Sequence, residues 1–216
     1  MSINLGIYDF FAYLVPGIMY LFLLNEFSGR LGWASFDVAQ VATQGIGAVA
    51  VVVLAAYVVG NLFDGLAHWF CYKFLTRKSV SATTLETLKR QYPHLNIQFE
   101  PNDYHLLFVI LRGRNPQFTQ TLDRFVANSI LLKNVSLASA LYAVLQLSMF
   151  FGGFSVDNLL LFLGGLIACW LAYRSSKMYH TWFFLDVFEG SLAYGANVQE
   201  VLANQQPKTA KLPGPG

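Results

Sequence analysis

Charged side chains are scarce in this sequence. Asp, Glu, Lys and Arg together make up 12% of its 216 residues, whereas soluble domains carry about a quarter. Hydrophobic residues make up 55%, and the formal net charge is only +2. This composition excludes an ordinary soluble domain and the strongly basic balance typical of nucleic-acid binding. We therefore expect a membrane protein that contacts lipid and has no direct nucleic-acid partner.

Cysteines and catalytic motifs are also scarce. Cys71 and Cys169 are the two cysteines, without CxxC spacing, which excludes a disulfide framework and a zinc knuckle. No GxSxG, HExxH, Walker or dinucleotide-binding glycine motif is present. The piece FDGLAH resembles the start of the CDP-alcohol phosphotransferase motif, but His68 replaces its arginine and no second aspartate pair follows. The sequence thus indicates no catalytic residue, cofactor or metal site, and favours a non-enzymatic protein.

Long charge-free runs are what the sequence does contain. Gly45 to Phe63 has nineteen residues without charge, enough to cross a bilayer core as a helix at about 1.5 Å per residue. Three further runs lie between charged residues: Asp9 to Glu26, Lys133 to Asp157 and Asp157 to Arg174. We predict an all-α integral membrane protein with four transmembrane helices.

These spans divide the chain into five predicted parts. They are 1–70 with helices 1 and 2, 71–134 as a cytoplasmic helical insertion, 135–174 with helices 3 and 4, 175–204 as a cytoplasmic helix, and 205–216 as a disordered tail. Thr83 to Glu86 matches a capping box that would start a helix in the insertion. Asn115-Pro116 predicts another start, from which the third span extends as one long helix. The short GGFSVDN segment predicts that spans three and four form an antiparallel hairpin.

Basic residues predict the orientation. Nine of the fourteen lie between Cys71 and Asn134, and four lie at or after Arg174. Arg30 is the one basic residue in the two remaining loops. Because basic residues concentrate on the cytoplasmic side, we expect a multi-pass inner-membrane protein with both termini in the cytoplasm.

A polar stripe follows the second span. Its members recur at helical spacing: Tyr57, Asn61, Asp64 and His68. Counting from Gly45 places Asp64 near the cytoplasmic boundary. In a structural interpretation Asp64 pairs with one of three basic residues, Arg174, Lys177 or His180. Two alternatives stay open, an ion path lined by the stripe and catalysis or metal binding by Asp64 and His68.

Small residues and a basic pair suggest contact surfaces. Small side chains recur every four residues on two spans: Ala56 and Gly60 on the second, and Gly164, Ala168 and Ala172 on the fourth. This spacing permits close helix packing, either within one chain or in a homo-oligomer. Arg112 and Arg114 form a small patch for lipid headgroups, a protein or a nucleic acid, with anionic lipid as the default.

The start of the first span carries a resemblance. YDFFAYLVPG, from Tyr8 to Gly17, resembles the entry of small four-span bacterial inner-membrane proteins, some of which accompany phage-defence genes. The layout is similar to the membrane subunit of Kiwa-type defence systems and to membrane accessories of some RNA-targeting CRISPR systems. The resemblance implies a place in such a defence system and no particular site residue.

Two functions follow as hypotheses. The first is a non-enzymatic, oligomeric sensor, anchor or pore-type component whose cytoplasmic helices dock a soluble protein. The second is a membrane-embedded enzyme or transporter that uses Asp64, His68 and His180 at the cytoplasmic interface.

Overall fold

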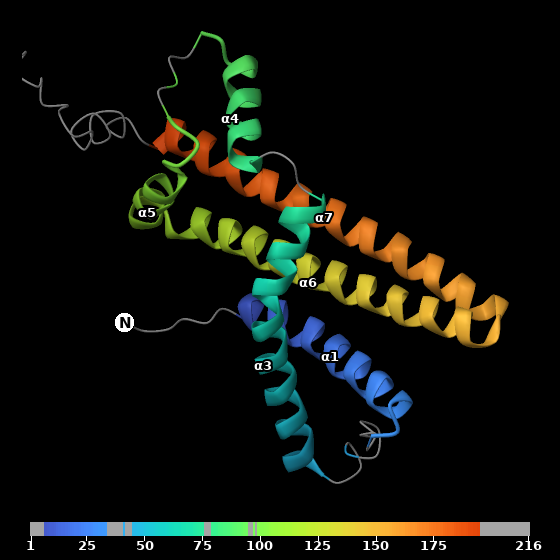
Figure 1. Ribbon diagram of the computed structural model, residues 1–216. Helices are drawn as coiled ribbons and strands as arrows, with labels where there is room; N and C mark the ends of the chain where they lie inside the picture. Colours follow the sequence, from blue (N-terminus) through green and yellow to red (C-terminus); the bar gives the residue numbers. More distant parts are fainter. Residues whose placement is uncertain are drawn as a thin grey trace, which may run out of the picture. The chain divides into compact units, whose positions relative to one another are not determined.

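The described part of the protein consists of helices (Figure 1). The computed structural model describes residues 7–33, 41, 45–75, 79–94, 97 and 99–194, and no strand occurs among them. The elements are α1 (Ile7–Arg30), α3 (Ile46–Phe70), the π-helical turn η1 (Cys71–Leu75), α4 (Val80–Gln91), α5 (Tyr104–Arg114), α6 (Pro116–Gly153) and α7 (Val156–Tyr194). The predicted tail at 205–216 and the predicted continuation of the last helix to 204 lie outside the described residues.

Four of these helices are long and apolar enough to cross a membrane: α1, α3 continued into η1, α6 and α7. This confirms an all-helical chain with four candidate spans. A helix needs about twenty residues to cross a bilayer, whereas α6 has 38 and α7 has 39. Both helices are therefore long enough to continue outside the lipid.

The chain divides into two compact units. Unit 1 comprises Met1–Ser79 and Arg124–His180, and unit 2 comprises Val80–Asp123 and Thr181–Gly216. Helices α6 and α7 each continue from one unit into the other without a break in the helix.

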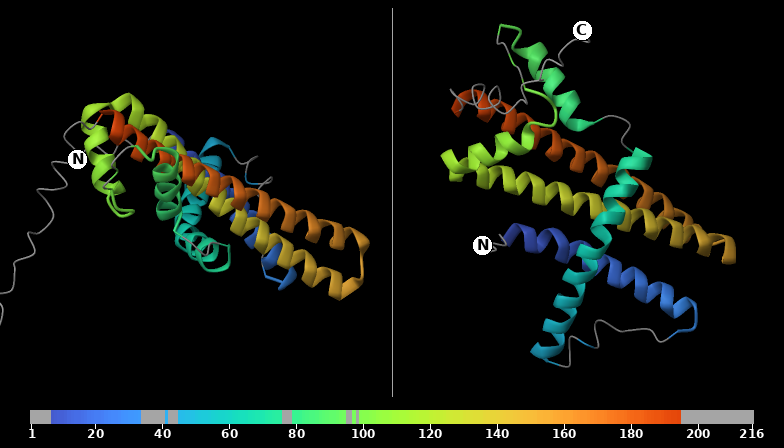
Figure 2. Two further views of the ribbon diagram at one scale, coloured as in Figure 1. Left: turned by 90° about the horizontal axis from the view of Figure 1, so that it is seen from above. Right: turned by 60° about the vertical axis from the view of Figure 1, so that its left-hand side comes forward.

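Small polar residues line the contact between α6 and α7 in unit 1. The Ser129 hydroxyl donates to the Ser176 carbonyl at 3.3 Å, and the Ser176 hydroxyl donates to the Ser129 carbonyl at 2.9 Å. Further along, the Ser136 hydroxyl donates to the Cys169 carbonyl at 3.0 Å. Residue numbers rise on α6 as they fall on α7, so the two helices form the predicted antiparallel hairpin (Figure 2).

Glycines bring α1 and α3 into backbone contact. A Cβ atom at Gly17 would overlap the carbonyl oxygen of Ala56, and one at Gly60 would overlap the carbonyl oxygen of Tyr13. Ala56 is fully buried. The small residues Ala56 and Gly60 of the second span therefore pack against the first span of the same chain, as small residues do where helices approach closely.

Aromatic rings fill the core of unit 2. Phe99 and Phe188 stack with ring centroids 6.3 Å apart, and Tyr104 meets Phe184 edge-on at 4.9 Å. Buried leucines from three helices complete this core: Leu88, Leu107, Leu111 and Leu122. Unit 2 thus has an apolar core of its own.

Replacing Phe188 by alanine should destabilise unit 2 by about 3–5 kcal/mol, because the ring is fully buried and its removal leaves a cavity. Hydrogen exchange of α4 and α5 is expected to accelerate while exchange of α1 and α3 is unchanged. The control Val109→Ala alters a side chain that is 65% exposed and should leave exchange as it was. Unchanged exchange in Phe188→Ala would show that this ring does not organise the unit.

Two helix starts in unit 2 were predicted, with different outcomes. The capping box at Thr83 is wrong, because α4 begins at Val80. The hydroxyls of Thr84 and Thr87 donate to the carbonyls of Val80 and Thr83, at 2.8 and 2.9 Å, so the threonines lie inside the helix. The second start is confirmed: α6 begins at Pro116 and the Asn115 Oδ1 accepts the Phe118 N–H at 3.1 Å.

Candidate functional site

Hydrogen bonds join three candidate spans inside unit 1. The Asn134 amide on α6 donates to Asp64 Oδ1 on α3 at 2.9 Å. The Tyr20 hydroxyl on α1 donates to the Asn134 carbonyl at 2.9 Å and lies 3.2 Å from Asn134 Oδ1. Asn134 is fully buried and Tyr20 is 1% exposed. We call Tyr20, Asp64 and Asn134 the polar cluster.

The ring of Tyr20 is held from a second side. It stacks on the ring of Phe63, one residue before Asp64, with centroids 4.3 Å apart. This stacking restricts the orientation of the Tyr20 ring, so that its hydroxyl points toward Asn134. The polar cluster is therefore positioned by packing as well as by hydrogen bonds.

Charged and titratable groups surround the polar cluster. Lys133 precedes Asn134 on α6 and lies close enough to Asp64 for their charges to interact. His180 on α7 lies within electrostatic range of both Lys133 and His68. Three long helices, α3, α6 and α7, thus bring a carboxylate, an ammonium group and two imidazoles into one region of unit 1.

Two contacts locate the polar cluster along α1 and α6. Arg124 lies over the ring of Tyr8, with 4.9 Å between the guanidinium carbon and the ring centroid, and Arg30 contacts Met149. Asn134 follows Arg124 by ten residues, about 15 Å along a helix, and precedes Met149 by fifteen, about 22 Å. The polar cluster therefore lies between these two contacts along α6.

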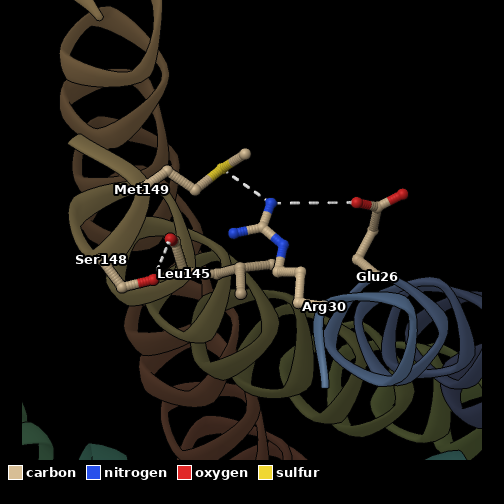
Figure 3. A network of polar contacts seen from close by, with 5 residues as sticks. All are labelled: Glu26, Arg30, Leu145, Ser148 and Met149. Atoms are coloured by element: carbon tan, nitrogen blue, oxygen red, sulfur yellow. Dashed lines mark hydrogen bonds and ion pairs between the residues drawn. The ribbon is translucent and has the colours of Figure 1, made fainter. Parts of the chain in front are cut away.

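Arg30 holds the far end of the contact between α1 and α6 (Figure 3). Its Nη2 donates to the Met149 sulfur at 2.7 Å and lies 3.9 Å from the Glu26 carboxylate. Tyr20 contacts Asn134, and Arg30, further along α1, contacts Met149, further along α6, so the two helices run parallel. Parallel directions are required of the first and third spans in a protein that crosses the membrane four times.

The predicted polar stripe divides between different surroundings. Tyr57 stacks on Phe10 with centroids 5.5 Å apart, so it packs against α1. Asp64 is half-buried and turns to α6, whereas Asn61 and His68 are exposed. In this single chain the stripe does not face one common passage.

The three basic residues expected near Asp64 all lie on α7. Arg174 stacks over the ring of Trp170 at 5.4 Å. Lys177 is exposed and His180 is half-buried near Lys133. An ion pair between Asp64 and one of them stays a prediction, while the carboxylate has Asn134 as a hydrogen-bond donor.

The small residues of the fourth span do not share one surface. Ala172 is buried, whereas Gly164 and Ala168 are exposed and line a shallow apolar groove of about 270 Å³. A second apolar groove, of about 330 Å³, lies between α1, α3 and α6, beside Tyr20 and Phe27. Neither groove has the polar walls that an ion path needs.

The basic pair of the predicted insertion lies in unit 2. Arg112 and Arg114 are exposed in the last turn of α5. Cations are stabilised there by the helix dipole, so their position already has a structural reason. Their use as a lipid or partner patch stays a prediction.

Three residues of this region were not predicted from the sequence as site residues: Tyr20, Lys133 and Asn134. Lys133 and Asn134 interrupt a helix that carries no other charge between Arg124 and its end at Gly153. A lysine beside an asparagine within a span is a signal for a polar contact. The signal was missed because both residues were assigned to the edge of the insertion. Among the described residues, no group of three or more His, Cys, Asp or Glu side chains could hold a metal ion.

Four long apolar helices define a multi-pass membrane protein, with a polar cluster between three of its spans. No protein-family model, curated protein or solved structure matches this chain. The resemblance of its first span to defence-associated membrane proteins stays a prediction.

Proposed function

We propose that this protein is a non-enzymatic, self-associating anchor of the inner membrane that presents unit 2 to a cytoplasmic protein. Both termini face the cytoplasm in this proposal. The observation that carries it is the polar cluster, in which Tyr20, Asp64 and Asn134 hydrogen-bond to one another across three candidate spans. The resemblance of the first span supports a bacterial defence or sensing system as the setting.

The hydrogen bonds of the polar cluster favour an anchoring role over catalysis. Asp64 accepts from Asn134, and Asn134 accepts from Tyr20. A general acid, base or nucleophile needs a free face toward its substrate. Bonds between spans instead hold helices together, because lipid offers no alternative partner.

The architecture of unit 2 supports docking as its role. The core of this unit is built from aromatic rings of Phe99, α5 and α7 and from buried leucines of α4, α5 and α6. Cross-linking in living cells followed by mass spectrometry should place partner peptides on α4 or α5. Cross-links confined to unit 1 would contradict docking.

One observation favours a second candidate, a proton-coupled transporter. Asp64 lies within electrostatic range of Lys133, Lys133 within range of His180, and His180 within range of His68, so a carboxylate, an ammonium group and two imidazoles follow one another. Chains of such groups inside spans are typical of proton relays. An enzyme that uses Asp64, His68 and His180 belongs to the same alternative.

Reconstitution separates the two candidates. Liposomes that contain the wild-type protein should show proton and potassium fluxes no greater than protein-free liposomes. Asp64→Asn keeps an acceptor oxygen for Asn134 but removes the carboxylate that interacts with Lys133, so it should cost less stability than Asp64→Leu and is assayed below its unfolding temperature. A clear wild-type flux that Asp64→Asn abolishes while the protein is still folded would establish the transporter instead.

A further inference from the structure

Asn61 has an unusual position for a polar side chain. It lies near the middle of the candidate span Ile46–Lys73 and three residues before Asp64. Its side chain is exposed on α3, and its carboxamide has no hydrogen-bond partner among the described residues. Hydrocarbon tails offer no hydrogen bond, so an amide at this depth requires a partner from outside the chain.

The surface around Asn61 is open and partly flat. Gly65 follows one helical turn later, and a Cβ atom there would meet nothing within 4 Å. Val58 and Leu62 flank the amide and are 47% and 74% exposed. Of the four candidate spans, α3 is the least covered by the rest of the chain. We call Val58, Asn61, Leu62 and Gly65 the outer face of α3.

Gly60 shows that this openness is specific to the outer face. It lies one residue before Asn61, and a Cβ atom there would overlap the Tyr13 carbonyl oxygen on α1. One glycine of α3 therefore serves packing within the chain, while Gly65 serves no contact that the described residues make. An unused glycine one turn from an unpaired amide is the arrangement by which spans associate.

We propose that the outer face of α3 binds the same face of a second copy, with the two Asn61 carboxamides hydrogen-bonded to each other. A carboxamide carries both donors and acceptors, so it is complementary to itself. Two copies in one bilayer share an orientation, and a twofold axis along the membrane normal brings equal residues of parallel helices together. Gly65 then lets the two backbones approach. This inference rests on the self-association in the proposed function and locates that self-association on α3.

The test uses labelled protein in liposomes at increasing dilution in lipid, with dimers counted by single-molecule photobleaching. Gly65→Leu should raise the dissociation constant at least tenfold, because the side chain is harmless within one chain and blocks the second copy. Asn61→Leu should raise it about tenfold, and Asn61→Gln should recover part of the loss. The matched control is Gly164→Leu on α7, another exposed glycine with nothing within 4 Å of its Cβ position. It should leave the dimer unchanged.

Disulfide cross-linking provides an independent readout in a background with Cys71→Ala and Cys169→Ala. Asn61→Cys should form dimers on oxidation, whereas Val49→Cys, a 42% exposed position on the opposite side of α3 from Val58, should not. Dimers that survive Gly65→Leu and cross-link through Val49→Cys would overturn this interface and leave self-association standing. A wild-type protein that stays monomeric at every dilution would overturn both.

Discussion

Asp64→Leu should destabilise the protein by about 3 kcal/mol. The change removes the acceptor of the Asn134 amide and the carboxylate that interacts with Lys133. Lys133, which is half-buried between the helices, is then left with an uncompensated charge, which costs roughly 3 kcal/mol. Thermal unfolding in a mild detergent, followed by a fluorescent probe of the buried cysteines, measures the loss.

A second substitution shows whether the charge is responsible. Adding Lys133→Met to Asp64→Leu removes both members of the pair and should recover more than half of the lost stability, because apolar replacements of a buried pair are often neutral. Lys133→Met alone should lower the unfolding free energy only slightly, because Asp64 still accepts a hydrogen bond from the Asn134 amide. If the double variant is no more stable than Asp64→Leu, Lys133 and Asp64 do not form the interaction described above.

Gly60→Ala should cost about 3 kcal/mol or more, although it adds a single methyl group. The new Cβ atom would overlap the Tyr13 carbonyl oxygen. The overlap is between backbone atoms and the new methyl group, so no flexible side chain can move aside to relieve it. The contact between α1 and α3 must then open, which should also weaken the polar cluster through Tyr20. Thermal unfolding and hydrogen exchange of α1 measure both effects.

The matched control for Gly60→Ala is Gly164→Ala. Gly164 is also in the middle of a span, and its Cβ position is open. Alanine favours the helix over glycine by about 0.5–1 kcal/mol, so this variant should be as stable as the wild type or slightly more so. Equal losses in the two variants would mean that the glycine contact between α1 and α3 is not formed.

The spans and the hairpin were accessible from the sequence because they depend on local patterns. A charge-free run such as Gly45 to Phe63 needs no knowledge of its neighbours to be recognised. The start of α6 was also local, since the Asn115 side chain caps a backbone group three residues away. The capping box predicted at Thr83 was wrong for a local reason too. Threonine hydroxyls inside a helix can donate to carbonyls of the preceding turn instead of capping a helix start.

The partners of the polar stripe were not accessible in the same way. Spacing places Tyr57, Asn61, Asp64 and His68 along one side of a helix, but α3 has different neighbours at each level. Tyr57 meets α1, and Asp64 meets Asn134, which is 70 residues away in the chain. Which helix covers which part of a stripe depends on tertiary packing, and periodicity carries no information about that.

The depth of Asp64 in the membrane stays a prediction. Counting from Gly45 places it near the cytoplasmic boundary, whereas its hydrogen-bond partner Asn134 lies on α6 between the contact of Arg124 with Tyr8 and that of Arg30 with Met149. A charge-free run alone does not fix this depth, because α3 continues past its run into η1.

A double-mutant cycle tests most directly whether the polar cluster ties the spans together. Tyr20→Phe removes the hydroxyl that donates to Asn134, and Asn134→Leu removes the amide between Tyr20 and Asp64. Each single variant should lose about 1–3 kcal/mol of unfolding free energy, and their coupling should be about 1 kcal/mol, because both act on shared hydrogen bonds. Losses that simply add, within about 0.3 kcal/mol, would show that Tyr20 and Asn134 act independently and would contradict the polar cluster.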